Sequence, residues 1–249
     1  MKPLLRWLAL VLLAAVALEL FFVLRIALMA VVDPQSTSFQ RSEIWAQLHS
    51  RGSLRWQQQW VPYAQISDHL KRAVIASEDD GFVSHEGVDW NAIEKAWERN
   101  ARAEAQAQAR AGKAAKAAPA ARPARPPKIR GGSTITQQLA KNLLLSGERT
   151  LLRKGQEFIL TMALELFLSK QRILEIYLNN VEWGEGVFGA EAAAQHYYRK
   201  SAARLAPAEA ARLAVMLPAP KRFEKTPGSA YLAGRTRTIL ARMGSAELP

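Results

Sequence analysis

The hydrophobic pattern of the chain opens with one long apolar run over residues 7–32, which is interrupted only by Glu19 and Arg25. A helix that spans a bilayer needs about 20 apolar residues, so this run is long enough to cross a membrane. It predicts a transmembrane anchor over the same residues, after a short tail at residues 1–6. A carboxylate in such a helix, here Glu19, either marks a contact with another helix or is tolerated because a partner lies close.

The basic residues of the short tail give the expected orientation. Lys2 and Arg6 precede the anchor, and basic residues stay preferentially on the cytoplasmic side. We therefore expect a single-pass protein of the cytoplasmic (inner) membrane, with the N-terminus in the cytoplasm and the remainder on the periplasmic, outer face. The alternative is a cleaved signal peptide with its cleavage site at residues 15–17, but the apolar core of such a peptide is only about 7–15 residues long.

Residues 33–60 form a polar juxtamembrane segment that contains Trp45, Trp56 and Trp60. Tryptophan favours the membrane–water interface, so these rings could rest on lipid headgroups. Packing of the same rings into the following domain is an equally good interpretation.

Residues 61–249 have the pattern of a mostly α-helical domain. Apolar residues recur at helical spacing over 66–100, with a turn at residues 80–81 and a second helix over 91–100. Residues 159–168 are strongly apolar but too few to span a bilayer, so they predict a core helix. No long alternating strand is present. Residues 170–179 predict a helix whose core-facing stripe is Ile173, Leu174, Tyr177 and Leu178.

Residues 101–130 differ from the rest of the domain in composition. Alanine occupies thirteen of the thirty positions and proline four, and eight Lys or Arg face a single acidic residue, Glu104. The segment therefore carries +7 of the net charge of +12. It has almost nothing to bury, so we interpret it as a flexible basic insertion, with a helix at its start as a further possibility. On an outer membrane face these charges would meet lipid headgroups or a pyrophosphate.

The first candidate for chemistry is the acidic turn Glu78-Asp79-Asp80-Gly81. Repulsion among three successive carboxylates raises the affinity of at least one for a proton. A carboxyl group with a raised pKa suits a general base near neutral pH. A solvated acidic turn is the plain alternative.

The second candidate is the start of a helix after two glycines at residues 131–132. Thr134 and Gln137 fit a capping box, and a helix N-terminus with open backbone amides attracts phosphate. This helix has an apolar stripe and, off that stripe, a polar face suited to a sugar and a phosphate. The polar face is formed by Gln137, Gln138, Lys141 and Asn142. An ordinary capped amphipathic helix is the alternative.

The third candidate is a cluster of basic residues around one carboxylate. Arg149, Arg153 and Glu157 recur at intervals of four, which predicts one helical face, and Lys154 lies beside them. A salt-bridged surface is the alternative, although a cation N-terminal to its carboxylate is the less favourable order at this spacing. Cations beside a carboxylate suit a site that holds a pyrophosphate leaving group.

Four motifs in series resemble those of the peptidoglycan glycosyltransferases, the family 51 glycosyltransferases. They are E-D-x-x-F-x-x-H-x-G-x-D at 78–89, G-G-S-T-I-T-Q-Q with K-N at 131–142, R-K-x-x-E at 153–157 and K-x-x-I-L-E-x-Y-L-N at 170–179. The resemblance covers about residues 60–228 and departs from the family pattern in the long insertion. It implies a lysozyme-like fold and an inverting polymerisation of lipid II into β-1,4-linked glycan strands, with release of undecaprenyl pyrophosphate.

The resemblance also implies the roles of individual residues. Glu78 would be the general base, and Glu157 would act at the donor site with Lys141, Arg153 and Lys154. The substrate-binding set that we expect is Asp79, Phe82, His85, Ser133, Thr134, Gln137, Gln138, Lys141, Asn142, Arg149, Arg153 and Lys154. We expect no required cofactor and no structural metal. Stimulation by a divalent cation, Mg or Mn, near Asp79 or Asp80 stays open.

The expected partners are lipid II, the growing strand on undecaprenyl pyrophosphate, the membrane and other cell-wall synthesis proteins. No S-x-x-K motif is present, which argues against a transpeptidase and for the monofunctional type. The rival interpretations are a lytic enzyme that cleaves glycan and a non-catalytic cell-wall scaffold. Nucleic-acid binding has only the charge in its favour, because the basic segment lacks aromatic residues for base stacking.

Overall fold

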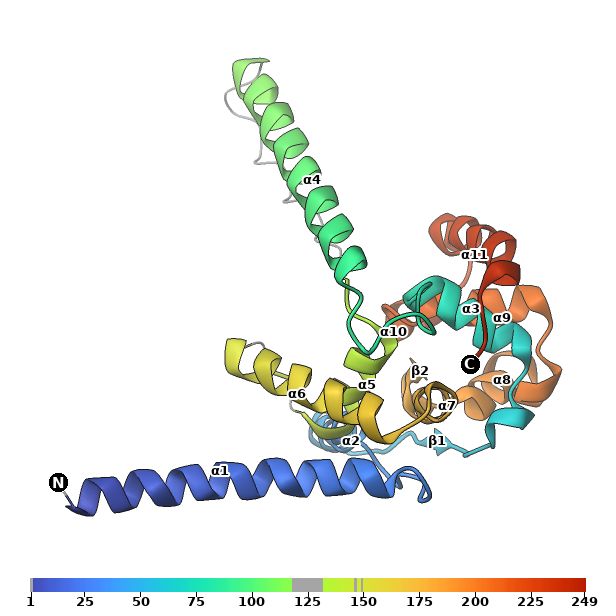
Figure 1. Ribbon diagram of the computed structural model, residues 1–249. Helices are drawn as coiled ribbons and strands as arrows, with labels where there is room; N and C mark the ends of the chain where they lie inside the picture. Colours follow the sequence, from blue (N-terminus) through green and yellow to red (C-terminus); the bar gives the residue numbers. More distant parts are fainter. Residues whose placement is uncertain (1, 118–131, 146, 149) are drawn as a thin grey trace. The chain divides into compact units, whose positions relative to one another are not determined.

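The computed structural model describes all residues except 1, 118–131, 146 and 149, and most of them are helical (Figure 1). The chain divides into two compact units, residues 1–87 with 134–249, and residues 88–133. The expected mostly α-helical class is confirmed.

The larger unit contains ten of the described helices and a small sheet. The helices are α1 (Lys2–Leu28), α2 (Ser38–Arg51), α3 (Asp68–Glu78), α5 (Ile135–Leu144), α6 (Leu151–Phe167), α7 (Lys170–Asn180), α8 (Ala190–Tyr198), α9 (Pro207–Met216), α10 (Pro220–Lys225) and α11 (Ala230–Arg242). Short 3-10 turns occupy Tyr63–Gln65, Ala202–Arg204 and Met243–Ser245. The strands are β1 (Gln57–Gln58), β2 (Glu182–Gly184) and β3 (Val187–Phe188), in the order β1-β3-β2 with a parallel and an antiparallel pairing.

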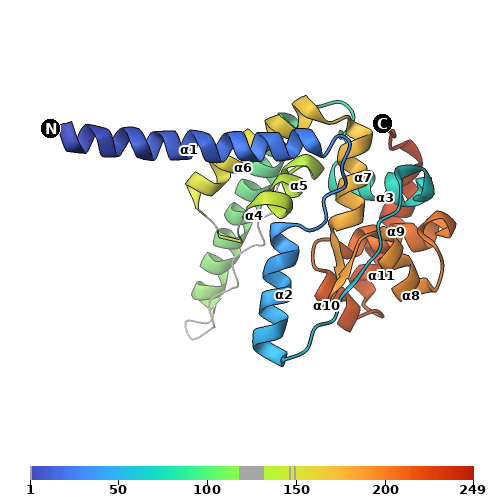
Figure 2. The same ribbon diagram turned by 90° about the horizontal axis from the view of Figure 1, so that it is seen from below.

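The core of the larger unit surrounds α7, which contacts α5, α6 and α8. The stripe expected on this helix is confirmed, because Ile173, Leu174, Tyr177 and Leu178 are each at most 1% exposed. A second group of contacts joins α3, α9 and α11, which lie together in all views (Figure 1, Figure 2). The end of α3 is therefore held from two sides, and Glu78 is the last residue of that helix.

The expected anchor is a helix, α1, and within the described residues it alone is long and apolar enough to cross a membrane. Its side chains from Lys2 to Leu18 are exposed. Near its C-terminal end Ile26 is buried, and so is Met29, which directly follows the helix. This helix is compatible with membrane anchoring, and its orientation stays a prediction.

The prediction of a core helix over residues 159–168 is wrong for one face of α6. Leu160 and Leu164 are fully buried, but Leu166 is 77% exposed and Ile159 is half exposed. The reason is that the neighbours of α6, which include α5, α1 and α7, leave one of its apolar faces uncovered. An apolar composition does not distinguish a helix buried all round from one that leaves an apolar face uncovered.

The smaller unit contains α4 (Trp90–Ala117), so the helix that the sequence left open at the start of the insertion is present over residues 101–117. The helix expected over 91–100 is confirmed and continues through residue 117, well into the basic segment. Alanine, glutamine, arginine and lysine are strong helix formers, so a segment with nothing to bury can still be helical. Residues 118–130 lie outside the described residues.

The tryptophans of the juxtamembrane segment divide between the two interpretations. Trp56 packs against Phe188 with ring centroids 4.6 Å apart. Trp60 packs against the core and lies beneath the guanidinium of Arg172, at 5.5 Å. Trp45 is 66% exposed. Two of the three rings therefore belong to the domain.

Candidate active site

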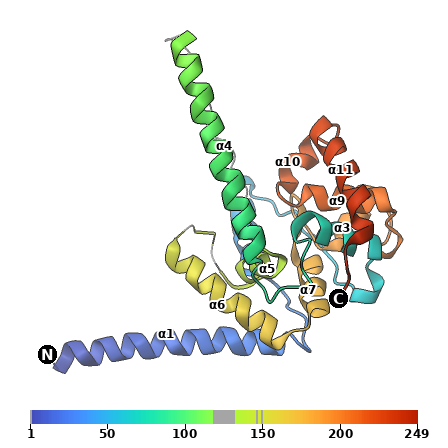
Figure 3. The same cartoon turned by 45° about the horizontal axis from the view of Figure 1, so that its top comes forward.

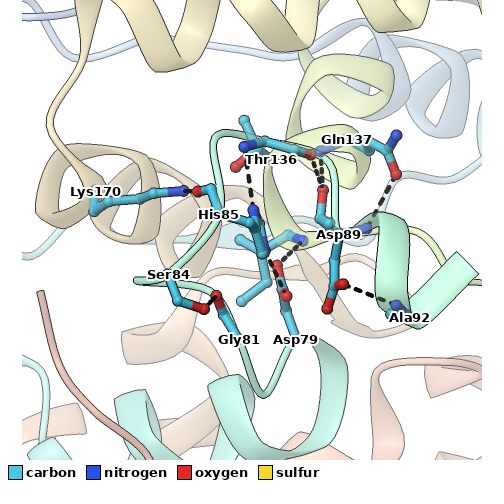
Figure 4. A network of polar contacts seen from close by, with 12 residues as sticks. Asp79, Gly81, Ser84, His85, Asp89, Ala92, Thr136, Gln137 and Lys170 are labelled. Carbon is cyan, nitrogen blue, oxygen red and sulfur yellow. Dashed lines mark hydrogen bonds and ion pairs between the residues drawn. The ribbon is translucent and has the colours of Figure 1, made fainter.

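The acidic turn is fixed by Asp79, the residue that ends α3. Its carboxylate accepts a hydrogen bond from His85 Nε2 at 2.8 Å and another from the backbone amide of Ile135 at 2.9 Å (Figure 4). The amide of Gly87 donates to His85 Nδ1 at 3.1 Å, so the tautomer with hydrogen on Nε2 satisfies both contacts. The turn is thereby tied to the start of α5, 56 residues further along the chain.

The start of α5 confirms the predicted capping box. Thr134 Oγ1 accepts from the amide of Gln137 at 3.2 Å, and Gln137 Oε1 accepts from the amide of Thr134 at 3.1 Å. Thr134 Oγ1 also donates to the carbonyl of Gly87 at 2.6 Å. Gly87 has φ +83°, and a Cβ there would lie 2.7 Å from Thr161, so glycine is required.

This geometry corrects one expectation about the helix N-terminus. We expected its open amides to attract a phosphate, but the amide of Ile135 donates to the carboxylate of Asp79. The positive end of the helix is therefore occupied by the carboxylate of Asp79, a group of the protein itself. Thr134 and Gln137 are buried, and the side-chain oxygen of each accepts a hydrogen bond in the cap.

Glu78 lies beside this cap and is half-buried. Its Oε2 accepts from Gln138 Nε2 at 3.2 Å, and Gln138 Oε1 accepts from the hydroxyl of Tyr177 at 3.0 Å. Burial raises the pKa of Glu78 above its ordinary value, and hydrogen bonds from Gln138 and Ser77 and the charge of Arg235 oppose that rise only in part. A carboxylate with a raised pKa is a stronger base than an ordinary one, which suits it to accept a proton from a substrate.

A second network supports the turn from the other side. Lys170, at the start of α7, donates to the carbonyl of His85 at 2.5 Å (Figure 4). It also donates to Glu165 Oε1 at 2.9 Å. Thr136 donates to the same Glu165 oxygen at 2.6 Å. The ammonium of Lys170 also lies 4.7 Å from the ring of Phe82, which is fully buried. Helices α5, α6 and α7 thus converge on the segment that follows Glu78.

The basic cluster lies on α6. Glu157 is buried, and its two oxygens accept from Arg153 NH1 at 2.8 Å and from Lys154 Nζ. Lys154 is half exposed, so one of the two cations stays accessible. Arg153 Nε is buried and has no hydrogen-bond partner among the residues that the structure describes. Since α6 begins at Leu151, the predicted helical face is confirmed for Arg153 and Glu157.

The remaining predicted residues are spread more widely. Lys141 is exposed and Asn142 half-buried on α5, beyond the turn that bears Gln138. Ser133 is exposed and belongs to the smaller unit. Arg149 lies outside the described residues. The structure therefore brings the predicted residues together in two groups, one around Glu78 and Asp79 and one around Glu157.

The acidic turn offers little for a cation. Both oxygens of Asp79 are engaged, and Asp80 pairs with Arg242 at 2.9 Å. Within the described part of the chain, no three His, Asp or Glu side chains group as a metal site.

Four residues of these networks were not among the predicted site residues. Tyr177 was assigned to the core, and its ring is buried as expected, but its hydroxyl orients Gln138. Lys170 and Glu165 flank the α6–α7 junction. Lys170 begins the fourth motif, but no role was assigned to it, and Glu165 gave no signal of its own. The charge of Arg235 acts on the pKa of Glu78 because α11 packs on α3. The local sequence does not reveal this packing.

The chain matches the model of a known protein family. The transglycosylase family model matches residues 46–112 and 113–244, so the chain belongs to the transglycosylase family. It is a glycosyltransferase.

Individual relatives agree over the whole chain. The chain is 51% identical to a biosynthetic peptidoglycan transglycosylase of Herminiimonas arsenicoxydans, over 100% of this chain and 99% of the relative. It is 50% identical to the protein of that name from Paraburkholderia xenovorans, over 98% and 94% of the two chains. A third relative of the same name, from Janthinobacterium, is 50% identical over 100% and 99%.

Proposed function

We propose that the chain polymerises lipid II into β-1,4-linked peptidoglycan strands and releases undecaprenyl pyrophosphate. The observation that carries this proposal is the carboxyl group of Glu78, which has a raised pKa and is oriented by Gln138 and Tyr177. The names of the relatives add the substrate, because they are peptidoglycan transglycosylases.

In the proposed reaction Glu78 removes the proton from the 4-hydroxyl of the acceptor lipid II. That oxygen forms a bond to C1 of the donor sugar as the bond from C1 to the pyrophosphate breaks, with inversion at C1. The electron pair leaves on the pyrophosphate, which is already a good leaving group. A strong general acid is therefore not needed, in contrast to glycoside hydrolysis.

The cluster on α6 would receive that leaving group. Arg153 and Lys154 would offset the charge that develops on the pyrophosphate, which is the electrostatic role that such cations perform in phosphoryl chemistry. Glu157 would act there by holding both cations in place, because each of its oxygens is paired with one of them. Lys141 and Arg149 would add further positive charge.

The remaining candidates divide into two groups in this proposal. Asp79, Phe82, His85, Thr134 and Gln137 would position Glu78 and the start of α5, because they are engaged within the protein. Gln138, Asn142 and Ser133 would contact the sugar or phosphate groups of the substrate.

The proposed location is the cytoplasmic membrane, with α1 as a single-pass anchor and the catalytic domain on the periplasmic face. The supporting features are the apolar α1 and the basic residues Lys2 and Arg6 before the anchor's apolar run. Membrane lipid, the growing strand and other cell-wall synthesis proteins are the proposed partners.

The experiment that tests the proposed function incubates the purified full chain with lipid II, and separately with finished glycan. Polymer and free undecaprenyl pyrophosphate are expected from lipid II, and no cleavage of the glycan. Cleavage of finished strands without polymer would favour the lytic alternative, and no reaction with either would favour a scaffold. Because we propose no required cofactor, polymer should still form after treatment with EDTA. Addition of Mg or Mn then measures any stimulation.

A further inference from the structure

The anchor helix contains one acidic residue, Glu19, and the structure gives it a partner. Glu19 Oε1 accepts a hydrogen bond from Gln156 Nε2 of α6 at 3.1 Å. A carboxyl group within a membrane-spanning segment is costly and is therefore almost always paired or turned toward protein. Gln156 directly precedes Glu157, which holds the two cations of the α6 cluster.

Glu19 lies at the edge of the face through which α1 contacts the domain. Every side chain from Lys2 to Leu18 is exposed, and Glu19 is the first one that is partly buried. Further along, Phe22 and Val23 pack against the core, and Ile26 is fully buried, so the contact recurs at helical spacing. Helix α1 contacts α6, which passes beside it in each view (Figure 1, Figure 3).

A second contact fixes the C-terminal end of α1. Arg172 of α7 donates from Nε to the carbonyl of Met29 at 2.8 Å and from NH2 to Asp33 at 2.7 Å. The anchor is thus held to α7 at its end and to α6 at Glu19. A slide or rotation of α6 along the anchor would have to break the hydrogen bond of Glu19.

We propose that Glu19 is a positioning residue that holds the first turns of α6, and with them Arg153 and Lys154, in register with the anchor. The inference rests on the proposed donor-site function of this cluster. Arg153, Gln156 and Glu157 lie within two turns of one helix, so a change in the position of Gln156 is transmitted to the cations. A small misplacement of a group that stabilises the transition state lowers the rate even when the altered residue is remote from the reacting atoms.

The geometry of the contact predicts different effects for two substitutions of Glu19. Glu19 uses only one oxygen, since Oε2 is buried and has no hydrogen-bond partner in the described part of the chain. The amide of glutamine offers the same acceptor oxygen with nearly the same shape. Leucine fits an apolar interface but accepts no hydrogen bond. The function of Glu19 should therefore survive Glu19→Gln and be lost in Glu19→Leu.

The kinetic test compares Glu19→Leu, Gln156→Leu and the double variant, each in the same liposomes with lipid II. We expect kcat to fall about three- to tenfold in all three, as for the loss of one interhelical hydrogen bond, with KM unchanged. The double variant should be no worse than either single one, and Glu19→Gln should retain the wild-type rate. Leu20→Ala is the matched control, because Leu20 is 63% exposed on α1.

Wild-type kcat in Glu19→Leu, or an equal loss in Glu19→Gln, would overturn the proposal. So would independent losses that multiply in the double variant, because the two residues would then not act through one contact.

A second measurement does not depend on activity. The chain has no cysteine, so Glu19→Cys with Gln156→Cys introduces a single pair that a short thiol-specific crosslinker can join in membranes. Leu20→Cys with Gln156→Cys is the control pair. Preferential crosslinking of the first pair supports the contact, and equal or absent crosslinking contradicts it. If the wild-type protein makes no polymer, the proposed function fails, while the crosslinking result still decides whether the contact exists.

Discussion

At the scale of single residues, the site depends on how neutral groups surround one carboxyl group. Glu78 receives hydrogen bonds from an amide and a hydroxyl, and no cation pairs with it directly among the described residues. A direct ion pair would lower the pKa of Glu78 and weaken it as a base. The amide of Gln138 is oriented in turn by Tyr177, whose hydroxyl leaves only the NH2 group to face Glu78.

The first prediction concerns Tyr177→Phe, which removes the hydroxyl and keeps the buried ring. The amide of Gln138 then loses its orientation and stabilises the charged form of Glu78 less well, so the pKa of Glu78 should rise further. A base acts when it is deprotonated, and kcat falls as the pH drops through its pKa. We expect the acidic limb of the pH–kcat profile to move to higher pH. Tyr231→Phe, at an exposed position, is the control, and superimposable profiles for Tyr177→Phe and wild type would contradict the assignment.

A second prediction concerns Glu182 on β2, which is 6% exposed and whose pKa burial raises to about 7. Lys221 lies 3.3 Å away and also pairs with Glu43. For a carboxyl group with a raised pKa, the contribution to stability is fully present below the unfolded pKa and is lost as the pH rises through the folded pKa. The contribution of Glu182 should therefore be lost between about pH 4.5 and pH 7.

The measurement is the melting temperature of wild type, Glu182→Gln and Glu148→Gln in one detergent between pH 5 and pH 8. Glu182→Gln should gain stability relative to wild type as the pH rises, because the amide cannot ionise. Glu148 is exposed and serves as the control. A constant difference between Glu182→Gln and wild type across this range would mean that Glu182 does not titrate there.

At the scale of elements, local signals were predictable and distant contacts were not. The capping box of Thr134 and Gln137 was predictable because both residues lie in one turn of helix. The bond from Ile135 to Asp79 was not, because it joins residues 56 positions apart. A helix at the start of the alanine-rich segment was foreseen as a possibility, but its extent to residue 117 was not predicted. The exposed face of α6 could not be foreseen, because it depends on which neighbours cover the helix.

A prediction at this scale concerns the basic insertion. Replacing residues 103–126 with a brief Gly/Ser linker removes positive charge but no residue of the described core. Basic residues near an anionic surface gain about 1 kcal/mol each, and salt screens this attraction. KM for lipid II should rise, most clearly at low salt, with kcat nearly unchanged. A collapse of kcat at an unchanged melting temperature would instead assign the segment a direct part in catalysis.

At the scale of the whole molecule, the chain combines an apolar helix with a catalytic domain, and the resemblance of its motifs gave the family correctly. Four motifs in a fixed order were enough to assign the family. In the structure their residues lie on or next to α3, α5, α6 and α7. Their individual roles depend on side-chain contacts, which is why Asp79 and Thr134 prove to be engaged within the protein.

The prediction at this scale is the topology. A reporter that is active only outside the cytoplasm, fused after Pro249, should be active, because Lys2 and Arg6 favour a cytoplasmic N-terminus. Mass spectrometry of the membrane-extracted protein should find the residues before Ala17. Their absence would show cleavage and remove the anchor from the account.

The measurement that tests the central claim most directly is the turnover of lipid II by Glu78→Gln beside the wild-type protein. Glutamine keeps the shape and cannot accept the proton, and removal of a general base typically costs about 10²–10⁴-fold in rate. The variant should be at least as stable as wild type at neutral pH, because the carboxyl group that it replaces has a raised pKa and is costly to ionise there. We predict that polymerisation falls by at least about a hundredfold while lipid II binding is retained. Turnover near the wild-type rate in a folded Glu78→Gln protein would contradict the account.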